Sequence, residues 1–273
     1  MNRTVFSVII GVILFIFLPT RVEAAIFPTG HAHNDYEHTQ PLLDALDQGF
    51  YSVEADVFLI KETLLVGHYF LSLKPERTLE ALYLEPLRQR AEKLNGKIQP
   101  DSDHFDLWID LKTDWKELYP ALRKVFEKYD DLITHVEDGR TVKKAVRVIL
   151  SGNRPSAEVL AQEKKRYVFL DGRAGDLDSE IPCEMTPVIS DNWKSLFSWN
   201  GTGEMPPEER EKLKTLVRKA HEKGCRIRFW NTPDKEILWK TQFDFGVDYL
   251  NTDKPQQMRD FLRQVRKPQA PML

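Results

Sequence analysis

The chain has 273 residues, of which 41% are hydrophobic and 30% are charged. This apolar content excludes a disordered chain, and the length allows one large barrel or two small domains around a substantial core. The 39 Lys and Arg nearly balance the 42 Asp and Glu, for a formal net charge of −3. A nucleic-acid-binding protein would carry a basic stripe, so we expect no nucleic-acid partner, and no feature implies a protein partner.

The first 25 residues are typical of a signal peptide. Arg3 precedes an unbroken apolar run from Val5 to Leu18, VFSVIIGVILFIFL, which is shorter than the roughly 20 residues that cross a bilayer. Small residues follow where a peptidase would cut. The pattern predicts cleavage after Ala24 or Ala25, a mature domain over 26–273, and export as a secreted or periplasmic protein. An uncleaved N-terminal anchor is the alternative.

Eight short apolar runs then alternate with amphipathic segments. The runs predict a first strand that ends at Thr29-Gly30-His31 and further strands at 52–60, 107–112, 146–150, 167–170, 187–190, 226–230 and 249–251, with a hairpin arm at 64–69. Helices are expected at 41–48, 79–94, 115–129, 156–164, 207–223, 235–243 and 256–265.

This alternation predicts an α/β protein with a parallel sheet. Eight units in roughly 250 mature residues favour a single (β/α)8 TIM barrel. A doubly wound open sheet is the alternative, although no Gly-rich dinucleotide turn follows the first strand. Cys183 and Cys225, the only cysteines, each precede a strand of an expected neighbouring pair. The sequence allows a disulfide between them or two buried thiols.

Carboxylates and a lysine interrupt two of the apolar strands. Glu54 and Asp56 are two residues apart, so their side chains share one face, and Asp110 and Lys112 do the same on the next strand. In a TIM barrel these groups meet at the carboxyl ends of the strands, where the chemistry takes place. Three carboxylates form an oxygen-rich site for one divalent cation, Mg²⁺ or Ca²⁺. An ion pair inside the barrel is the structural alternative.

Two histidines, His31 and His68, accompany these carboxylates in the sequence. Because imidazole titrates near neutral pH, the pair can serve as general base and general acid. A divalent ion and Lys112 would neutralise phosphoryl oxygens, which suits a phosphodiester substrate. The His31-x-His33 pair also allows a multi-histidine metal hydrolase, but none of the remaining histidines lies at a predicted strand end after the third strand. We therefore interpret His33 as a supporting or structural residue.

Five motifs in this order resemble the phospholipase C-like phosphodiesterase superfamily, which includes glycerophosphodiester phosphodiesterases, phosphatidylinositol-specific phospholipases C and sphingomyelinase D-type toxins. The subgroup that the chain most resembles is the one named for altered inheritance of mitochondria protein 6. The motifs are His31-Ala-His-Asn34, Val53-Glu54-Ala-Asp56-Val57, Leu65-Val-Gly-His68, Ile109-Asp110-Leu-Lys112 and Asn251-Thr-Asp253.

The resemblance implies a metal-dependent phosphoric diester hydrolase that acts on a glycerophosphodiester or a phospholipid head group. It assigns the acid–base pair to His31 and His68, and the metal ligands to Glu54, Asp56 and Asp110. It also implies substrate contacts by Lys112, Asn34 and Trp230. Glycerophosphodiesterases usually have His-Arg where this chain has His31-Ala32, so a phosphate contact is missing. Arg154 or Arg173, just past the fourth and fifth strands, would replace it.

The segment from Trp193 to Trp199 follows the sixth strand and contains two Trp, one Phe and one Leu. Such a segment at the barrel mouth would hold an acyl chain or touch a membrane surface transiently, or else pack over the barrel rim. A lipid or small-molecule phosphodiester is thus the expected partner. A barrel that binds phospholipid head groups without turnover remains an alternative reading of the same residues.

Overall fold

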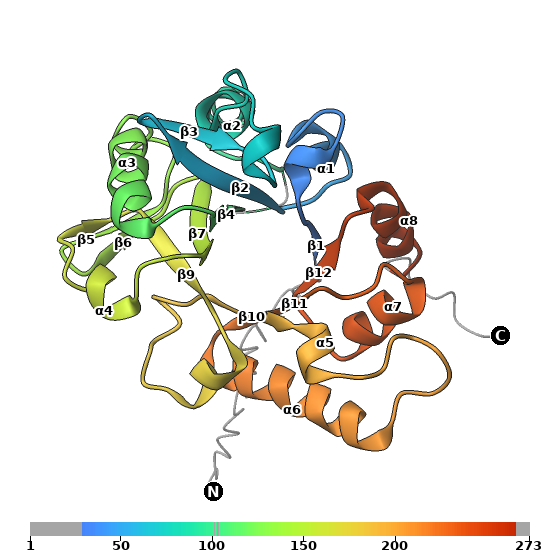
Figure 1. The fold of residues 1–273 in the computed structure, drawn as a ribbon. Coiled ribbons are helices and arrows are strands. Elements are labelled where there is room, and N and C mark those ends of the chain that lie inside the picture. Colours follow the sequence, from blue (N-terminus) through green and yellow to red (C-terminus); the bar gives the residue numbers. More distant parts are fainter. Residues whose placement is uncertain (1–28, 101, 103, 266–273) are drawn as a thin grey trace, which may run out of the picture.

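Eight parallel strands close into a barrel in the computed structural model, which describes residues 29–100, 102 and 104–265 (Figure 1). Pairing of the first strand with both the second and the last closes the ring, which confirms the TIM barrel and excludes the open sheet. The predicted signal peptide lies outside the described residues. The barrel strands are β1 (Thr29–Ala32), β2 (Ser52–Ile60), β4 (Phe105–Leu111), β7 (Val146–Gly152), β9 (Val168–Gly172), β10 (Val188–Asn192), β11 (Arg226–Trp230) and β12 (Tyr249–Thr252).

Helices cover the outside of the ring, as Figure 1 shows. The longest, α6, ends where Gly224 adopts a left-handed φ of 87°, a conformation that glycine takes without strain. The segment expected as one helix at 79–94 begins as a π-helical stretch, η3. The helices are α1 (Leu43–Asp47), η3 (Glu80–Leu84), α2 (Glu85–Lys93), α3 (Trp115–Glu127), α4 (Ala157–Leu160), α5 (Trp193–Leu196), α6 (Pro207–Lys223), α7 (Glu236–Asp244) and α8 (Pro255–Val265).

Two further strand groups lie beside the barrel. The predicted arm is β3 (Thr63–Val66), which pairs antiparallel with β2. A small antiparallel sheet of β5 (His135–Glu137), β6 (Arg140–Val142) and β8 (Lys165–Arg166) was not predicted. Its strands are only two or three residues long and largely polar, so they lack the apolar run that marks a buried strand.

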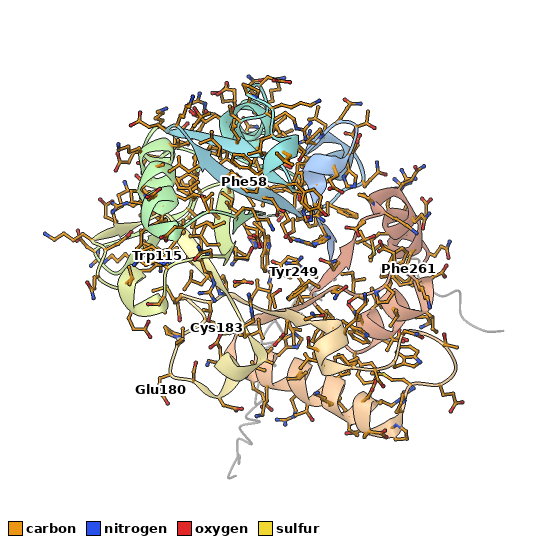
Figure 2. The ribbon with its side chains drawn as sticks, viewed as in Figure 1. Phe58, Trp115, Glu180, Cys183, Tyr249 and Phe261 are labelled. Carbon is orange, nitrogen blue, oxygen red and sulfur yellow. A yellow bond between two sulfur atoms is a disulfide. The ribbon has the colours of Figure 1, made fainter. Side chains whose placement is uncertain are left out.

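Two apolar clusters stabilise the fold. The larger lies between the strands and the surrounding helices. The smaller fills the inside of the barrel with inward-facing side chains from the strands, and Figure 2 shows Tyr249 within the ring of strands. Its members are Trp108, Ile149, Phe169, Val188 and Tyr249. The barrel is therefore a packed core rather than a pore, and its chemistry is confined to its ends.

Three sequence questions are answered by the packing. Cys183 and Cys225 form a disulfide, with their Cα atoms 5.3 Å apart, ahead of the neighbouring strands β10 and β11. Trp193 and Trp199 are buried, and the Trp193 indole N–H donates to the backbone oxygen of Trp199, so this segment packs over the rim. Among the described residues, no helix has the length and apolarity that a membrane span requires.

Candidate active site

A cavity of about 310 Å³ opens at the carboxyl ends of the strands. It brings together residues from β2, β4, β7, β9 and β11 and from the segments that follow β1 and β3. Ionisable groups of both signs line it, which would be costly for buried strand positions unless they were paired or held an ion. The lining residues are His33, Asn34, Glu54, His68, Asp110, Lys112, Ser151, Gly152, Asp171, Arg173, Arg228 and Trp230.

Three carboxylates meet at this end of the barrel as the strand pattern predicted. Glu54, Asp56 and Asp110 each offer an oxygen atom within 4.8 Å of the other two. The β2–β4 register places Asp56 directly opposite Asp110, and Glu54 stands one inward position lower on β2. Oxygen donors at this spacing suit a hard divalent cation.

A buried cluster beneath the cavity fixes Glu54. Both His31 and Arg228 donate to Glu54 Oε2, over 3.1 and 2.8 Å, and the other His31 nitrogen accepts from the Ser52 hydroxyl at 2.7 Å. Burial, followed by the charge of Arg228, lowers the His31 pKa to about 3, so this imidazole is neutral. Burial raises the pKa of Glu54, but Arg228 and the His31 bond outweigh it and hold that pKa well below its usual range.

His31 contributes no surface to the cavity, because its side chain is fully buried and both ring nitrogens are bonded. The expectation that it exchanges protons with a substrate therefore does not fit its position. The guanidinium of Arg228, which sequence reasoning missed, lies 4.6 Å from the Trp108 ring and also donates to the Asn251 side chain. The sequence did contain a signal for Arg228, because Arg226 and Arg228 alternate with apolar residues along β11 and so share one face of the strand.

A second cluster surrounds Asp56. The Tyr36 hydroxyl donates to Asp56 Oδ2 at 2.7 Å, and His68 Nδ1 lies 3.0 Å from both this oxygen and the Tyr36 hydroxyl. Lys112 Nζ bridges Asp56 at 2.9 Å and Asp110 at 3.0 Å. His68 thus donates through Nδ1, and its side chain is about one-third exposed at the cavity. This arrangement leaves Nε2 as the ring nitrogen available to a substrate.

The sequence predicted His31 at the cavity, but the structure places His33 there. His33 lies two residues after His31 on the same face, just past the end of β1, and its Nδ1 lies 2.7 Å from Asp253 Oδ1. Burial lowers the pKa of His33, but the bond to Asp253 and the charge of Glu54 outweigh it and raise that pKa. The signal was present in the sequence, because positions 31 and 33 share a face and Asp253 follows the last strand.

The expected substrate contacts fall into two groups. Lys112, Asn34 and Trp230 line the cavity. Arg154 does not line it, because its guanidinium donates to the side chain and backbone of Asp171. The alternative, Arg173, lines the cavity with a side chain that is 42% exposed.

The residues present fit a bound cation. The three carboxylates form ion pairs with only two cationic side chains, Lys112 and Arg228, so within this bonded group one negative charge has no partner. Burial, together with the charge of Glu54, raises the pKa of Asp56, which reports the same excess. Asp56 Oδ1 is also buried without a hydrogen-bond partner, a state that a coordinated ion would relieve.

Gly152 keeps the approach to Asp110 open. Its φ of 67° disfavours other residues, and a Cβ atom there would lie 2.5 Å from Asp110 Oδ1. Within the described ranges, the carboxylate trio is the one group of three or more possible metal-binding side chains, and it contains no histidine. His31 and His33 instead bind Ser52, Glu54 and Asp253. The multi-histidine hydrolase is therefore not supported.

Comparison with known proteins identifies the family of the chain. The family described as AIM6-like phosphodiesterase domain matches residues 20–171, and the glycerophosphoryl diester phosphodiesterase family matches residues 226–256. An altered inheritance of mitochondria protein 6 homolog from Arthroderma benhamiae is 32% identical, over 86% of this chain and 84% of that protein. The chain belongs to the AIM6-like phosphodiesterase family.

Other relatives agree with this assignment. The altered inheritance of mitochondria protein 6 from Eremothecium gossypii is 33% identical, over 82% of this chain and 66% of its own length. A glycerophosphodiester phosphodiesterase from Parabacteroides distasonis, of known crystal structure, superposes with a TM-score of 0.53 at 15% identity, over 88% of this chain and 98% of that one. At that identity the superposition shows the barrel fold alone.

The expectation of an exported protein is wrong in light of these comparisons. The AIM6-like relatives carry a name that refers to the inheritance of mitochondria rather than to secretion. The apolar run after Arg3 reports hydrophobicity and length, and those two properties do not specify a compartment.

Proposed function

We propose that this protein cleaves phosphodiesters with the help of one divalent cation, and that His33 and His68 move the protons. The observation that carries the proposal is a single cavity lined by two carboxylate-bonded imidazoles, by Glu54 and Asp110 of the carboxylate trio, and by three cationic side chains. Such a set matches the needs of phosphoryl transfer, in which charge must be neutralised and two oxygens exchange protons.

Mg²⁺ or Ca²⁺ would be held by Glu54, Asp56 and Asp110, and when bound it would neutralise charge on the phosphoryl group. Lys112 and Arg173 place two further positive charges at the cavity. Arg173 makes the phosphate contact for which the sequence offered both Arg154 and Arg173. Asn34 and Trp230 line the cavity and contact the rest of the substrate.

His33 takes the proton from the attacking oxygen, which belongs to water or to a neighbouring hydroxyl of the substrate. Asp253 supports this role, since a carboxylate bonded to the far nitrogen stabilises the imidazolium that forms. His68 returns a proton to the leaving oxygen. Asp56 bonds the Nδ1 atom of His68 and so holds the orientation of its ring.

The test is turnover of bis(p-nitrophenyl) phosphate and a panel of glycerophosphodiesters, each with Mg²⁺, Ca²⁺ or EDTA. We expect cleavage that requires the cation and is lost in the His33→Ala and His68→Ala variants. A folded protein that cleaves no diester with either cation would reject hydrolysis, and ligand binding without turnover would take its place.

A further inference from the structure

An apolar tip projects from the molecule immediately after His68. We define it as Tyr69, Phe70 and Leu71, whose residues are 67%, 62% and 95% exposed. They are consecutive, and they make up half of the large hydrophobic residues exposed in the described part of the chain. Large apolar groups gathered at one exposed place mark a site of interaction, whereas isolated ones are ordinary.

The tip is an ordered turn joined to the candidate active site. Phe70 to Ser72 form the short helix η2, and the Ser72 hydroxyl and backbone N–H both donate to the Tyr69 carbonyl, over 2.8 and 2.9 Å. The Tyr69 ring packs edge-on against His68, with ring centroids 4.4 Å apart. Figure 1 shows the preceding strand, β3, paired on β2 at the outside of the ring. The tip and His68 therefore hold a fixed spacing.

Charges beside the tip complement a phosphate-bearing surface. A second cavity, of about 320 Å³, lies between the tip and the active site, where His68 lines both cavities. Lys74 and Arg77 line this second cavity together with a single carboxylate, Glu37. Apolar side chains followed by cations are the combination that binds the boundary between phospholipid head groups and acyl chains.

The order of residues also matches the depth of that boundary. Tyr69 is extended, and extended residues advance about 3.3 Å each, whereas residues of a 3-10 helix such as η2 advance about 2 Å. Phe70 and Leu71 therefore lie up to about 7–9 Å beyond His68. Interfacial segments bury their apolar groups about 5–10 Å deep. With Phe70 and Leu71 among the acyl chains, His68 would stand at the level of the lipid phosphates.

We propose that Tyr69, Phe70 and Leu71 insert into a phospholipid surface and present the active site to lipid phosphodiesters there. This inference rests on the proposed function, and it names membrane lipid as the substrate class. It moves the membrane contact away from the Trp193–Trp199 segment, whose two tryptophans are buried. The long apolar side chain of Leu71, almost fully exposed, is otherwise unexplained.

The test measures binding to phosphatidylcholine vesicles, with and without phosphatidylserine, by co-sedimentation. The Phe70→Ser plus Leu71→Ser variant should lower the vesicle partition coefficient at least about tenfold, since it removes the groups that leave water. Hydrolysis of vesicle lipid relative to a soluble diester should fall by a similar factor. The matched control is Val159→Ser plus Ile237→Ser, two exposed apolar residues on α4 and α7, which should bind as the parent does.

A Phe70→Trp variant adds a readout that needs no turnover. The fluorescence of the introduced indole, taken as the difference from the parent with its six native tryptophans, should shift to the blue when vesicles are added. Equal partition of the tip variant and the parent, or an emission of that indole that vesicles leave unshifted, would overturn the proposal. The proposal would also be overturned if the parent did not bind vesicles but self-associated through the tip. Light scattering of the parent and of the Phe70→Ser plus Leu71→Ser variant would reveal such self-association. Vesicle binding without diester cleavage would reject the proposed function while leaving the docking tip in place.

Discussion

The two ends of the barrel interior hold similar residue types in opposite balance. At the amino ends of the strands, one buried carboxylate, Asp106, accepts two hydrogen bonds from Arg147, at 2.7 and 2.8 Å, and one from the Tyr249 hydroxyl. Arg226 donates to the same hydroxyl at 3.0 Å. At the carboxyl ends, three carboxylates face two cations, and Asp56 keeps one buried oxygen without a partner.

This difference predicts that the amino-end network stabilises the fold and that the carboxyl-end group serves the proposed reaction. Cations outnumber the single carboxylate at the amino end, and both of its oxygens are bonded, so that network is complete without a ligand. At the carboxyl end one carboxylate oxygen has no hydrogen-bond partner, and this group adjoins an open cavity. The apolar layer that includes Trp108 and Phe169 lies inside the barrel between them. Substitutions at the two ends should therefore affect different measurements.

The largest expected effect is on turnover at the carboxyl end. Replacing His33 or His68 by Ala should lower kcat for a soluble diester by about 10²–10⁴, the usual contribution of a general acid or base. Both side chains are partly exposed, so the melting temperature should change little. Steady-state kinetics at saturating Mg²⁺ would measure the loss. A variant with parental kcat would remove that histidine from the mechanism.

At the amino end the expected effect is on stability. Asp106→Ala leaves Arg147 buried without its carboxylate, which should cost about 3–5 kcal/mol of unfolding free energy, while turnover per folded molecule stays unchanged. Urea unfolding at pH 7 measures the cost. Loss of activity without loss of stability would contradict the division between the two ends.

The same contribution has a defined dependence on pH. Burial raises the pKa of Asp106, but Arg147 and His104 outweigh it and hold that pKa below its usual range. The stabilisation is therefore complete above the unfolded pKa of about 4 and is lost only as pH falls through the lower folded value. Unfolding curves for the parent and Asp106→Ala should converge only in strong acid.

His31 should show an intermediate effect, on the cation rather than on the proton transfers. It donates to Glu54 from below the cavity, so His31→Gln should weaken divalent-ion binding about 10–100-fold, as loss of a partner behind a metal ligand usually does. Titration calorimetry with Mg²⁺ or Ca²⁺ measures this directly. Excess cation should restore much of the turnover. Unchanged ion affinity with abolished turnover would return the acid–base role to His31.

The sequence predicted the barrel because each strand is a short apolar run followed by an amphipathic segment. Strands β2 and β11 and helix α6 begin and end where the sequence placed them. The sheet of β5, β6 and β8 was not predicted from the sequence, because its pairing depends on chain segments brought together by the fold rather than on apolar runs.

The sequence predicted which residue types form the candidate site, but not which of them reach the cavity. Alternation along a strand shows that positions 31 and 33 face the same way, yet it does not show which one reaches the cavity. That depends on where β1 ends relative to its neighbours, and on partners from distant strands. Asp253 is 220 residues from His33, and Arg228 is 174 residues from Glu54. Such pairings follow from barrel closure, which local sequence patterns do not encode.

The smallest expected effect tests the His33–Asp253 pair. Asp253→Asn keeps a hydrogen-bond acceptor for the imidazole but removes the charge, so turnover at pH 7 should fall roughly tenfold, the difference between a charged and a neutral hydrogen bond. As a general base, His33 must be unprotonated, and Asp253 raises its pKa above 6.5. Turnover of the parent should therefore rise with pH through a value above 6.5, and in the variant this limb should move to lower pH. A pH–rate profile records the shift. An acid limb that stays in place would mean that another group accepts the proton, because a purely structural contact has no reason to move it.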